Sequence, residues 1–289
     1  MPNQVIMRAI ILLLACNTSS FSFQKVYWKC IYDFYQSAIF TNKNENLQYL
    51  FITNVKHIPK DIDGIDFQNF FQINNIEIIY SELTYQVPKD WHGAWRNQFY
   101  VFDVLDKLKK TMGNFLILDS DCLIMKSLRE LFDEIDKKHI ICYNCGYSKT
   151  HEINGINEMQ MSDLYNDFYN EKKDINYKGG EFIALNNTVI TNVLEEFYHI
   201  FKLNYKKYNS SNVKLNEEAH FLSLIYSKLG YDNDEGNKYI KRMWTAFKFD
   251  NIKLEDCNLP IWHLPAEKKY AFSVLFNWFT IQQRTLMSI

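Results

Sequence analysis

The chain has 289 residues, of which 47% are hydrophobic and 23% are charged, as in ordinary globular proteins. Lysine and arginine number 32 against 34 aspartates and glutamates, so no basic excess favours a nucleic-acid-binding protein. The length suits one large α/β domain or two small ones. Because no Pro/Gly-rich linker, low-complexity block or internal repeat divides the sequence, we expect a single domain.

The first apolar run, residues 9–16, has two interpretations. With Arg8 before it, the run resembles a short signal peptide, and it is too short to span a bilayer. Alternatively it is a buried strand that ends in the polar loop 17–20. We favour the strand because an amphipathic helix at 23–40 and a second strand at 47–55 follow it, which completes a βαβ unit.

The alternation of strands and helices continues along the chain. Strands are predicted at 76–80, 115–118, 139–142 and 181–185, and helices at 66–73, 95–109, 127–136, 189–205 and 217–229. Ser127 and Glu130 form the pattern of a capping box for the helix at 127–136. The polar stretch 147–177 is expected to be an irregular acceptor loop or lid. This alternation indicates an α/β fold with a mostly parallel sheet.

Two acids one residue apart, Asp119 and Asp121, interrupt the apolar stretch FLILDSDCLIM. Buried charges are costly unless they are paired or bind a metal, and ligands of parallel sheets bind beyond the carboxyl ends of strands. Helix capping explains the acids poorly, because Ser127 and Glu130 already fill that role. Two interpretations remain. The acids are the DxD motif of a phosphatase of the haloacid dehalogenase type, or they are two oxygen ligands of Mg²⁺ or Mn²⁺.

Several segments together resemble the GT-A glycosyltransferases, which use nucleotide-sugar donors. FLILDSDCLI resembles the DxD strand of these enzymes, and WHGAWRNQFYVFDVL resembles the helix that precedes it. YKGGEFIALN resembles the segment that lines the donor-sugar pocket. LNEEAHFLSLIY resembles the acidic segment at the reaction centre. IWHLPAEKKY resembles the C-terminal His-then-Lys segment of the family 8-type enzymes. Gly-Gly-Glu stands where that family usually has Asn-Ala-Gly, and Asn-Glu-Glu where it has Asp-Gln-Asp. The resemblance is therefore to bacterial enzymes of surface-polysaccharide assembly.

The resemblance implies a fold and a set of ligands. The fold is a Rossmann-like, mostly parallel mixed sheet flanked by helices, with a nucleotide-binding half at about 1–125 and an acceptor half at about 126–289. The implied ligands of Mn²⁺ or Mg²⁺ are Asp119, Asp121 and His263. A histidine between apolar neighbours is otherwise a core residue. The implied donor contacts are Asn17, Thr18, Arg96, Asp119, Gly179, Gly180 and Lys268.

The candidates for a catalytic carboxylate are Glu181, Glu217 and Glu218, of which we favour Glu217. An inverting transfer needs a base for the acceptor hydroxyl, and a retaining transfer uses a carboxylate beside the donor sugar. The alternative for Glu217 and Glu218 is that acids in a first helical turn complement the helix dipole.

The sequence therefore predicts a metal-dependent enzyme that transfers a hexose from a nucleoside diphosphate sugar to a glycan or lipid-linked acceptor. UDP is the nucleotide that we favour. The alternatives are the phosphatase and a non-catalytic nucleotide-sugar-binding protein. Cys142 and Cys145 form a lone CxxC pair, so reduced cysteines of a cytoplasmic protein are favoured over a zinc or redox site. The aromatic tail 270–289 is expected to pack as a helix. A homodimer surface and a peripheral contact with the inner face of the membrane remain open for it.

Overall fold

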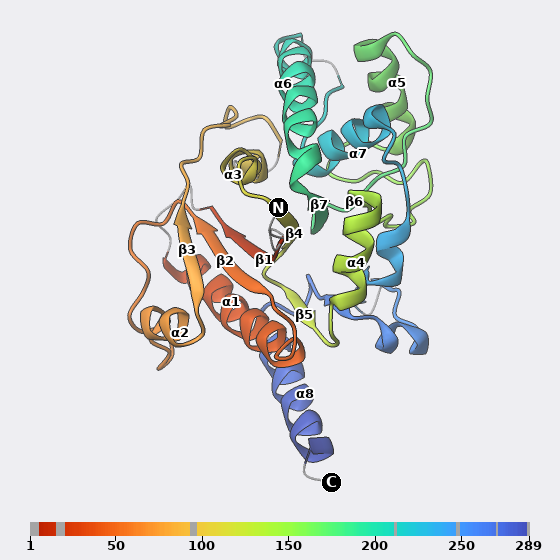
Figure 1. The fold of residues 1–289 in the computed structure, drawn as a ribbon. Coiled ribbons are helices and arrows are strands. Elements are labelled where there is room, and N and C mark those ends of the chain that lie inside the picture. Colours follow the sequence, from red (N-terminus) through yellow and green to blue (C-terminus); the bar gives the residue numbers. More distant parts are fainter. Residues whose placement is uncertain are drawn as a thin grey trace, which may run out of the picture.

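The computed structural model describes residues 6–15, 21–92, 97–210, 213–246, 249–269 and 271–287. Within these residues, six strands form one sheet in the order β3-β2-β1-β4-β7-β6 (Figure 1). Their bounds are β1 (Met7–Leu14), β2 (Gln48–Thr53), β3 (Ile76–Tyr80), β4 (Gly113–Leu118), β6 (Ile140–Ile141) and β7 (Phe182–Asn186). Strands β1 to β4 are mutually parallel, whereas β7 runs antiparallel to both β4 and β6.

The central strand β1 confirms the strand interpretation of the first apolar run. Ala9 and Ile11 face one core cluster and Ile10 and Leu12 face the other, and all four side chains are buried. A strand that is covered on both faces needs apolar residues at every position, which explains the unbroken run.

Helices cover both faces of the sheet (Figure 1). The core that contains Ile10 is shared with α1 (Phe21–Thr41), α2 (Phe67–Ile73) and α4 (Arg129–Lys138). The core that contains Ile11 is shared with α3 (Tyr100–Leu108), α5 (Glu158–Tyr169), α6 (Asn187–Asn209) and α7 (Glu218–Leu229). The sheet with helices on two faces is the α/β architecture that the sequence predicts.

The C-terminal helix α8 (Phe272–Met287) packs against α1 and extends beyond it (Figure 1). Phe272 and Phe276 are buried in a small core cluster with Cys30, which confirms that the tail packs as a helix. None of the described helices combines the length and apolar composition that a membrane span requires.

A second, smaller sheet brings the C-terminal part of the chain to the end of β4. It has the order β5 (Cys122–Ile124), β11 (Ile261–His263), β8 (Ile240–Arg242). Strand β11 pairs antiparallel with β5 and parallel with β8. The other described elements are a two-stranded ribbon of β9 (Thr245–Ala246) and β10 (Phe249–Asp250) and the 3₁₀ helices Glu235–Lys238 and Leu254–Asn258.

Three local predictions are wrong. The helix predicted at 95–109 begins at Tyr100 as α3, after a turn in which the Tyr100 N–H donates to the Asn97 carbonyl at 3.0 Å, and Trp95 and Arg96 lie outside the described residues. The stretch 147–177 contains the regular helix α5, which a capping box of Asn157 and Gln160 begins. The apolar period of α5 is weak, which explains why the sequence does not reveal that helix.

The capping box predicted at Ser127 is the third error, because Leu128 is the N-cap of α4 and makes no side-chain cap. The Leu128 N–H instead donates to the Asn42 side chain at 2.8 Å, while the Ser127 hydroxyl donates to Glu45. Of the described N–H groups, the Ser127 hydroxyl accepts only that of Arg129, at 3.2 Å, and a side chain from another segment supplies the contact to Leu128, which a sequence pattern does not reveal.

Candidate active site

The two acids occupy a tight turn where β4 ends. The Asp119 N–H donates to the Glu181 carbonyl at 3.3 Å, and the Cys122 N–H donates to the Asp119 carbonyl at 3.2 Å. The side chain of Asp119 is 57% exposed, whereas that of Asp121 is only 1% exposed. One carboxylate therefore faces solvent at the carboxyl edge of the sheet, and the other is buried beneath it.

His263 reaches these acids because β11 pairs with β5. The register places His263 opposite Cys122, and the Leu264 N–H donates to the Asp121 carbonyl at 2.9 Å. His263 Nε2 lies 3.3 Å from Asp121 Oδ2 and 3.9 Å from Asp119 Oδ2. One potential ligand atom from each of the three residues lies within 4.8 Å of the other two. The predicted metal ligands thus come together on one side of the small sheet.

The three side chains fit a divalent cation. Asp121 Oδ2 is buried and accepts no hydrogen bond of regular geometry from the described residues, although Lys268 Nζ lies 2.9 Å away. Carboxylate oxygens with one imidazole nitrogen are a ligand set that Mn²⁺ accepts, and the oxygens also suit Mg²⁺. Asp119 and Asp121 would supply the oxygens and His263 the nitrogen.

Opposite charges surround each buried member of this cluster. Burial disfavours the charged form of Asp121, but His263 and Lys268 outweigh that effect and hold the pKa of Asp121 well below its ordinary range. Burial also opposes a charge on His263, yet Asp121 and Glu181 raise the pKa of His263 to about 9. For Asp119, the desolvated surroundings and the charge of Asp121 raise the pKa to about 6, although much of its side chain is exposed. A bound cation would take the place of the His263 proton.

Glu181 connects the histidine to a buried arginine. Arg242 donates to Glu181 through Nε at 2.7 Å and through Nη2 at 2.5 Å, and His263 Nδ1 lies 3.2 Å from Glu181 Oε1. Burial opposes the charge of Glu181, but Arg242 and His263 outweigh it and lower its pKa. A histidine that donates from Nδ1 presents Nε2 to a metal, so these contacts favour an orienting role for Glu181 over a catalytic one.

Gly179 and Gly180 make room for two carboxylates. A Cβ on Gly179 would collide with Glu181 Oε2 and would lie 2.7 Å from a ring carbon of Tyr143. A Cβ on Gly180 would lie 2.7 Å from Glu218 Oε1. The glycine pair therefore permits the close approach of Glu181 and Glu218 to the backbone, whatever it contributes to sugar binding.

Glu217 is enclosed in a hydrogen-bond network. Tyr177 Oη donates to Glu217 Oε1 at 2.9 Å, and the Asn154 amide donates to Glu217 Oε2. His220 Nε2 lies 3.5 Å from Glu217 and 3.1 Å from the Ile153 carbonyl, while His220 Nδ1 accepts the Asn216 N–H at 3.1 Å. Both oxygens of Glu217 are thus occupied, and the network ties the segment 153–154 to the start of α7.

Glu218 differs from its neighbour. Its side chain is half-buried and its carboxylate accepts a hydrogen bond from its own backbone N–H, but it forms no ion pair with the described residues. Burial raises the pKa of Glu218 well above its ordinary value, and the charges of Glu217 and Asp119 raise it further. Arg242 and His263 contact Glu181, and Tyr177 and Asn154 bind Glu217, so Glu218 is the candidate carboxylate with the fewest contacts to other described residues.

The remaining donor-site predictions have separate outcomes. Lys268 lies at the cluster, 2.9 Å from Asp121, with its ammonium group 5.3 Å from the centre of the Tyr27 ring. Asn17, Thr18 and Arg96 lie outside the described residues. The sequence reasoning did not single out Arg242, Tyr177 or Asn154. No sequence signal marks Arg242, because its importance comes from the pairing of β8 with β11.

Solved structures define the class of fold. No family model and no curated protein sequence matches the chain. The fold is the GT-A fold of glycosyltransferases, which confirms the fold expected from the sequence. Mouse xyloside xylosyltransferase 1 is similar over 91% of this chain and 99% of its own, with a TM-score of 0.55 and 10% identity. An active-site mutant of LgtC is similar over 95% of both chains, with a TM-score of 0.51 and 12% identity. The bifunctional glycosyltransferase WbbM is similar over 92% of this chain and 47% of its own, with a TM-score of 0.56 and 12% identity. This chain thus spans about half of WbbM.

The orienting role of Glu181 can be measured on the metal alone. In Glu181→Gln the positive charge of Arg242 is no longer balanced and the His263 ring is held less firmly, so we expect manganese affinity to fall about 10- to 100-fold. Electron paramagnetic resonance of Mn²⁺ titrated into each variant measures this affinity. Glu217→Gln, a buried carboxylate outside the cluster, is the matched control. Equal affinities for Glu181→Gln and the unmodified protein would contradict the role.

The buried His220 gives the stability of the fold a dependence on pH. Burial lowers its pKa to about 3 from an ordinary value of 6.5. The unfolded chain then binds a proton that the folded chain does not, so this contribution reduces the free energy of unfolding as the pH falls from 6.5 towards 3. Urea unfolding between pH 7 and pH 4 should show a shallower decline in His220→Gln. Parallel profiles for the two proteins would show that His220 does not carry this dependence.

Proposed function

We propose that this protein is a metal-dependent glycosyltransferase that moves a hexose from a nucleoside diphosphate sugar, with UDP as the expected nucleotide, to a glycan or lipid-linked acceptor. The observation that carries the proposal is the cluster of Asp119, Asp121 and His263 beside Lys268, at the carboxyl end of β4 in a GT-A fold. Bound Mn²⁺ or Mg²⁺ would offset the charge of a diphosphate leaving group. Two structural neighbours are a xylosyltransferase and a bifunctional glycosyltransferase, which supports sugar transfer.

Each residue of the cluster has a part in this proposal. Asp119, Asp121 and His263 hold the cation, and Glu181 orients His263. Lys268 lies against Asp121 with 27% of its side chain exposed, so its ammonium group can contact both the site and a phosphate. Contacts to the diphosphate strengthen as negative charge develops on it, and such contacts accelerate the reaction. Asn17, Thr18 and Arg96 complete the proposed donor contacts.

Glu218 is the proposed reactive carboxylate. It lies against Gly180, close enough to Asp119 that the charge of Asp119 raises its pKa. A raised pKa brings a carboxylate nearer to the value at which it accepts a proton at neutral pH. Glu218 would act as the base in an inverting transfer, or as the carboxylate beside the donor sugar in a retaining one.

Aromatic side chains around Trp244, which follows β8, support the proposed acceptor site. Trp244 follows Arg242 by two residues, and its Nε1–H donates to Tyr147 Oη at 3.4 Å. The ring of Tyr147 stacks on His151, with centroids 4.6 Å apart and an interplanar angle of 18°. These three rings are partly exposed, and such faces pack well against sugar rings. We therefore propose an acceptor half at about 126–289 and a nucleotide-binding half at about 1–125.

A cytoplasmic location is part of the proposal. The described cysteines are all free thiols, which suits a reducing cytoplasm. Helix α8 exposes Val274, Trp278 and Ile281, which would suit a homodimer contact or a peripheral contact with the inner face of the membrane.

Nucleotide binding tests the donor site. Calorimetric titration with UDP, GDP and CMP should show UDP binding with Mn²⁺ and none with EDTA, because the cation offsets the repulsion between the diphosphate and the acids. Asp121→Ala should abolish binding with the fold intact by circular dichroism. Asp163→Ala, an exposed aspartate on α5, should bind as the unmodified protein does.

A folded protein that binds none of the three nucleotides would overturn the proposal. Release of phosphate from simple phosphoesters would then favour the phosphatase. Metal-dependent UDP binding without turnover of any UDP-sugar, in the presence of glycan acceptors, would favour the non-catalytic binding protein.

Two adjacent carboxylates test the catalytic assignment. We expect Glu218→Gln to reduce the release of UDP from a UDP-sugar donor by at least about 100-fold while UDP affinity is kept, since proton transfer typically contributes that much. Glu217→Gln should retain most of the turnover, because its oxygens are bound to Tyr177 and Asn154. The reverse result would return the catalytic role to Glu217.

A further inference from the structure

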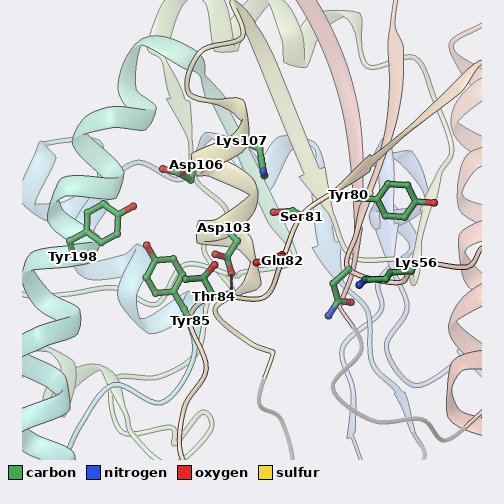
Figure 2. A pocket seen from close by; sticks show the side chains of 11 residues that line it. Lys56, Tyr80, Ser81, Glu82, Thr84, Tyr85, Asp103, Asp106, Lys107 and Tyr198 are labelled. Carbon is green, nitrogen blue, oxygen red and sulfur yellow. Dashed lines mark hydrogen bonds between the residues drawn. The ribbon is translucent and has the colours of Figure 1, made fainter.

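A cavity of about 730 Å³ lies at the carboxyl ends of β2 and β3 (Figure 2). Its walls come from the segments that follow these two strands, from α3 and from one side chain of α6. It shares no residue with the cluster of Asp119, Asp121 and His263. The volume lies within the range of roughly 300–1,000 Å³ that small-molecule sites occupy.

The walls of this cavity are anchored to the core. Asp103 on α3 is only 6% exposed and accepts the Thr84 N–H at 3.0 Å, which fixes the segment after β3 (Figure 2). Tyr100 Oη donates to the Ser81 carbonyl at 3.0 Å. The ring of Tyr85 packs edge-on against the buried Phe197, with centroids 4.9 Å apart. The cavity is thus preformed, which lowers the cost of ordering a ligand there.

The lining combines aromatic faces with charges of both signs. The ring centroids of Tyr85 and Tyr198 lie 6.0 Å apart on one side of the cavity, and Tyr198 is 38% exposed. Lys56 and Lys107 approach from the other sides, and neither forms an ion pair with a carboxylate of the described chain (Figure 2). Glu82, Asp103 and Asp106 offset the two lysines, so the lining favours neither an anion nor a cation.

Such a surface matches a carbohydrate better than a charged ligand. The apolar CH faces of sugar rings pack on tyrosine, and their hydroxyl groups both donate and accept hydrogen bonds. The lining offers ammonium donors, carboxylate acceptors and hydroxyl groups that serve as both.

We propose that this cavity is a second carbohydrate-binding site that holds a short oligosaccharide segment. As an extension of the proposed function, on which this part rests, that segment belongs to the glycan acceptor, which thereby extends from the acceptor half at about 126–289 onto the other half of the chain. Ser81 follows β3 and Asp119 follows β4, and these strands are three places apart in the sheet, or about 15 Å at the usual strand spacing. Both sites lie on the carboxyl edge of the sheet, so one glycan chain can reach both. Holding the chain at a distant point raises its effective concentration at the reaction centre.

The test uses an array of immobilised oligosaccharides, neutral and uronic-acid-containing, probed with the full-length protein in EDTA. We expect at least one oligosaccharide to bind without metal, and its Kd to rise about tenfold or more in Tyr198→Ala and in Lys107→Ala. Tyr205→Ala is the matched control, a tyrosine of the same helix that is 37% exposed and lies outside the cavity. All three variants should keep metal-dependent UDP binding.

Each outcome has a distinct meaning. No binding to any oligosaccharide, or binding that Tyr198→Ala and Lys107→Ala leave unchanged, overturns the second site. Binding that is lost in Asp121→Ala but kept in Tyr198→Ala assigns the oligosaccharide to the reaction centre and also overturns the second site. Oligosaccharide binding that depends on Tyr198, in a protein that binds no nucleotide, keeps the carbohydrate site and removes the glycosyltransferase proposal.

Discussion

The site depends on a chain of alternating charges that runs from Asp121 through His263 and Glu181 to Arg242. A buried charge is tolerated when an opposite charge and hydrogen bonds compensate it, and each member of this chain compensates the next. Lys268 balances Asp121 from another side. Removing one member would leave its neighbour uncompensated, which is more harmful than replacing the whole chain by apolar groups. The chain therefore determines both the geometry of the cluster and its sensitivity to substitution.

The small sheet supplies the geometry for this chain. Strand β11 lies between β5 and β8, so one register places His263 beside Cys122 on one side and Arg242 on the other. Glu181 reaches both basic side chains from the start of β7, which borders β4 in the main sheet. The two sheets thus meet at the acids. The exposed Asp119 lies at this meeting point, and Glu218 lies close enough that the charge of Asp119 raises its pKa.

Most of the main sheet could be predicted because its signals are local. The strands β1 to β4 are apolar runs separated by helices with a clear period, and each lies within a few residues of its predicted bounds. The DxD acids and His263 could be predicted through their resemblance to known segments. The capping of α4 by Asn42 and the pairing of Glu181 with Arg242 could not, because both contacts join segments far apart in the sequence. The sequence analysis favoured Glu217, whereas the contacts of the two residues favour Glu218, because adjacent residues at a helix start face different surroundings only once the helix is placed.

The order in which the chain is synthesised determines when the acidic turn at the end of β4 can assemble. The strands β1 to β4 leave the ribosome before β11 and Lys268 do, and Asp119 and Asp121 leave it with these strands. Until then, the acids lack the histidine and the lysine that compensate them, and their mutual repulsion opposes the burial of Asp121. The nascent chain can therefore pair its central strands early, but it completes the end of β4 only when β11 and Lys268 dock. Assembly of the acidic turn would thus be a late event in biosynthesis.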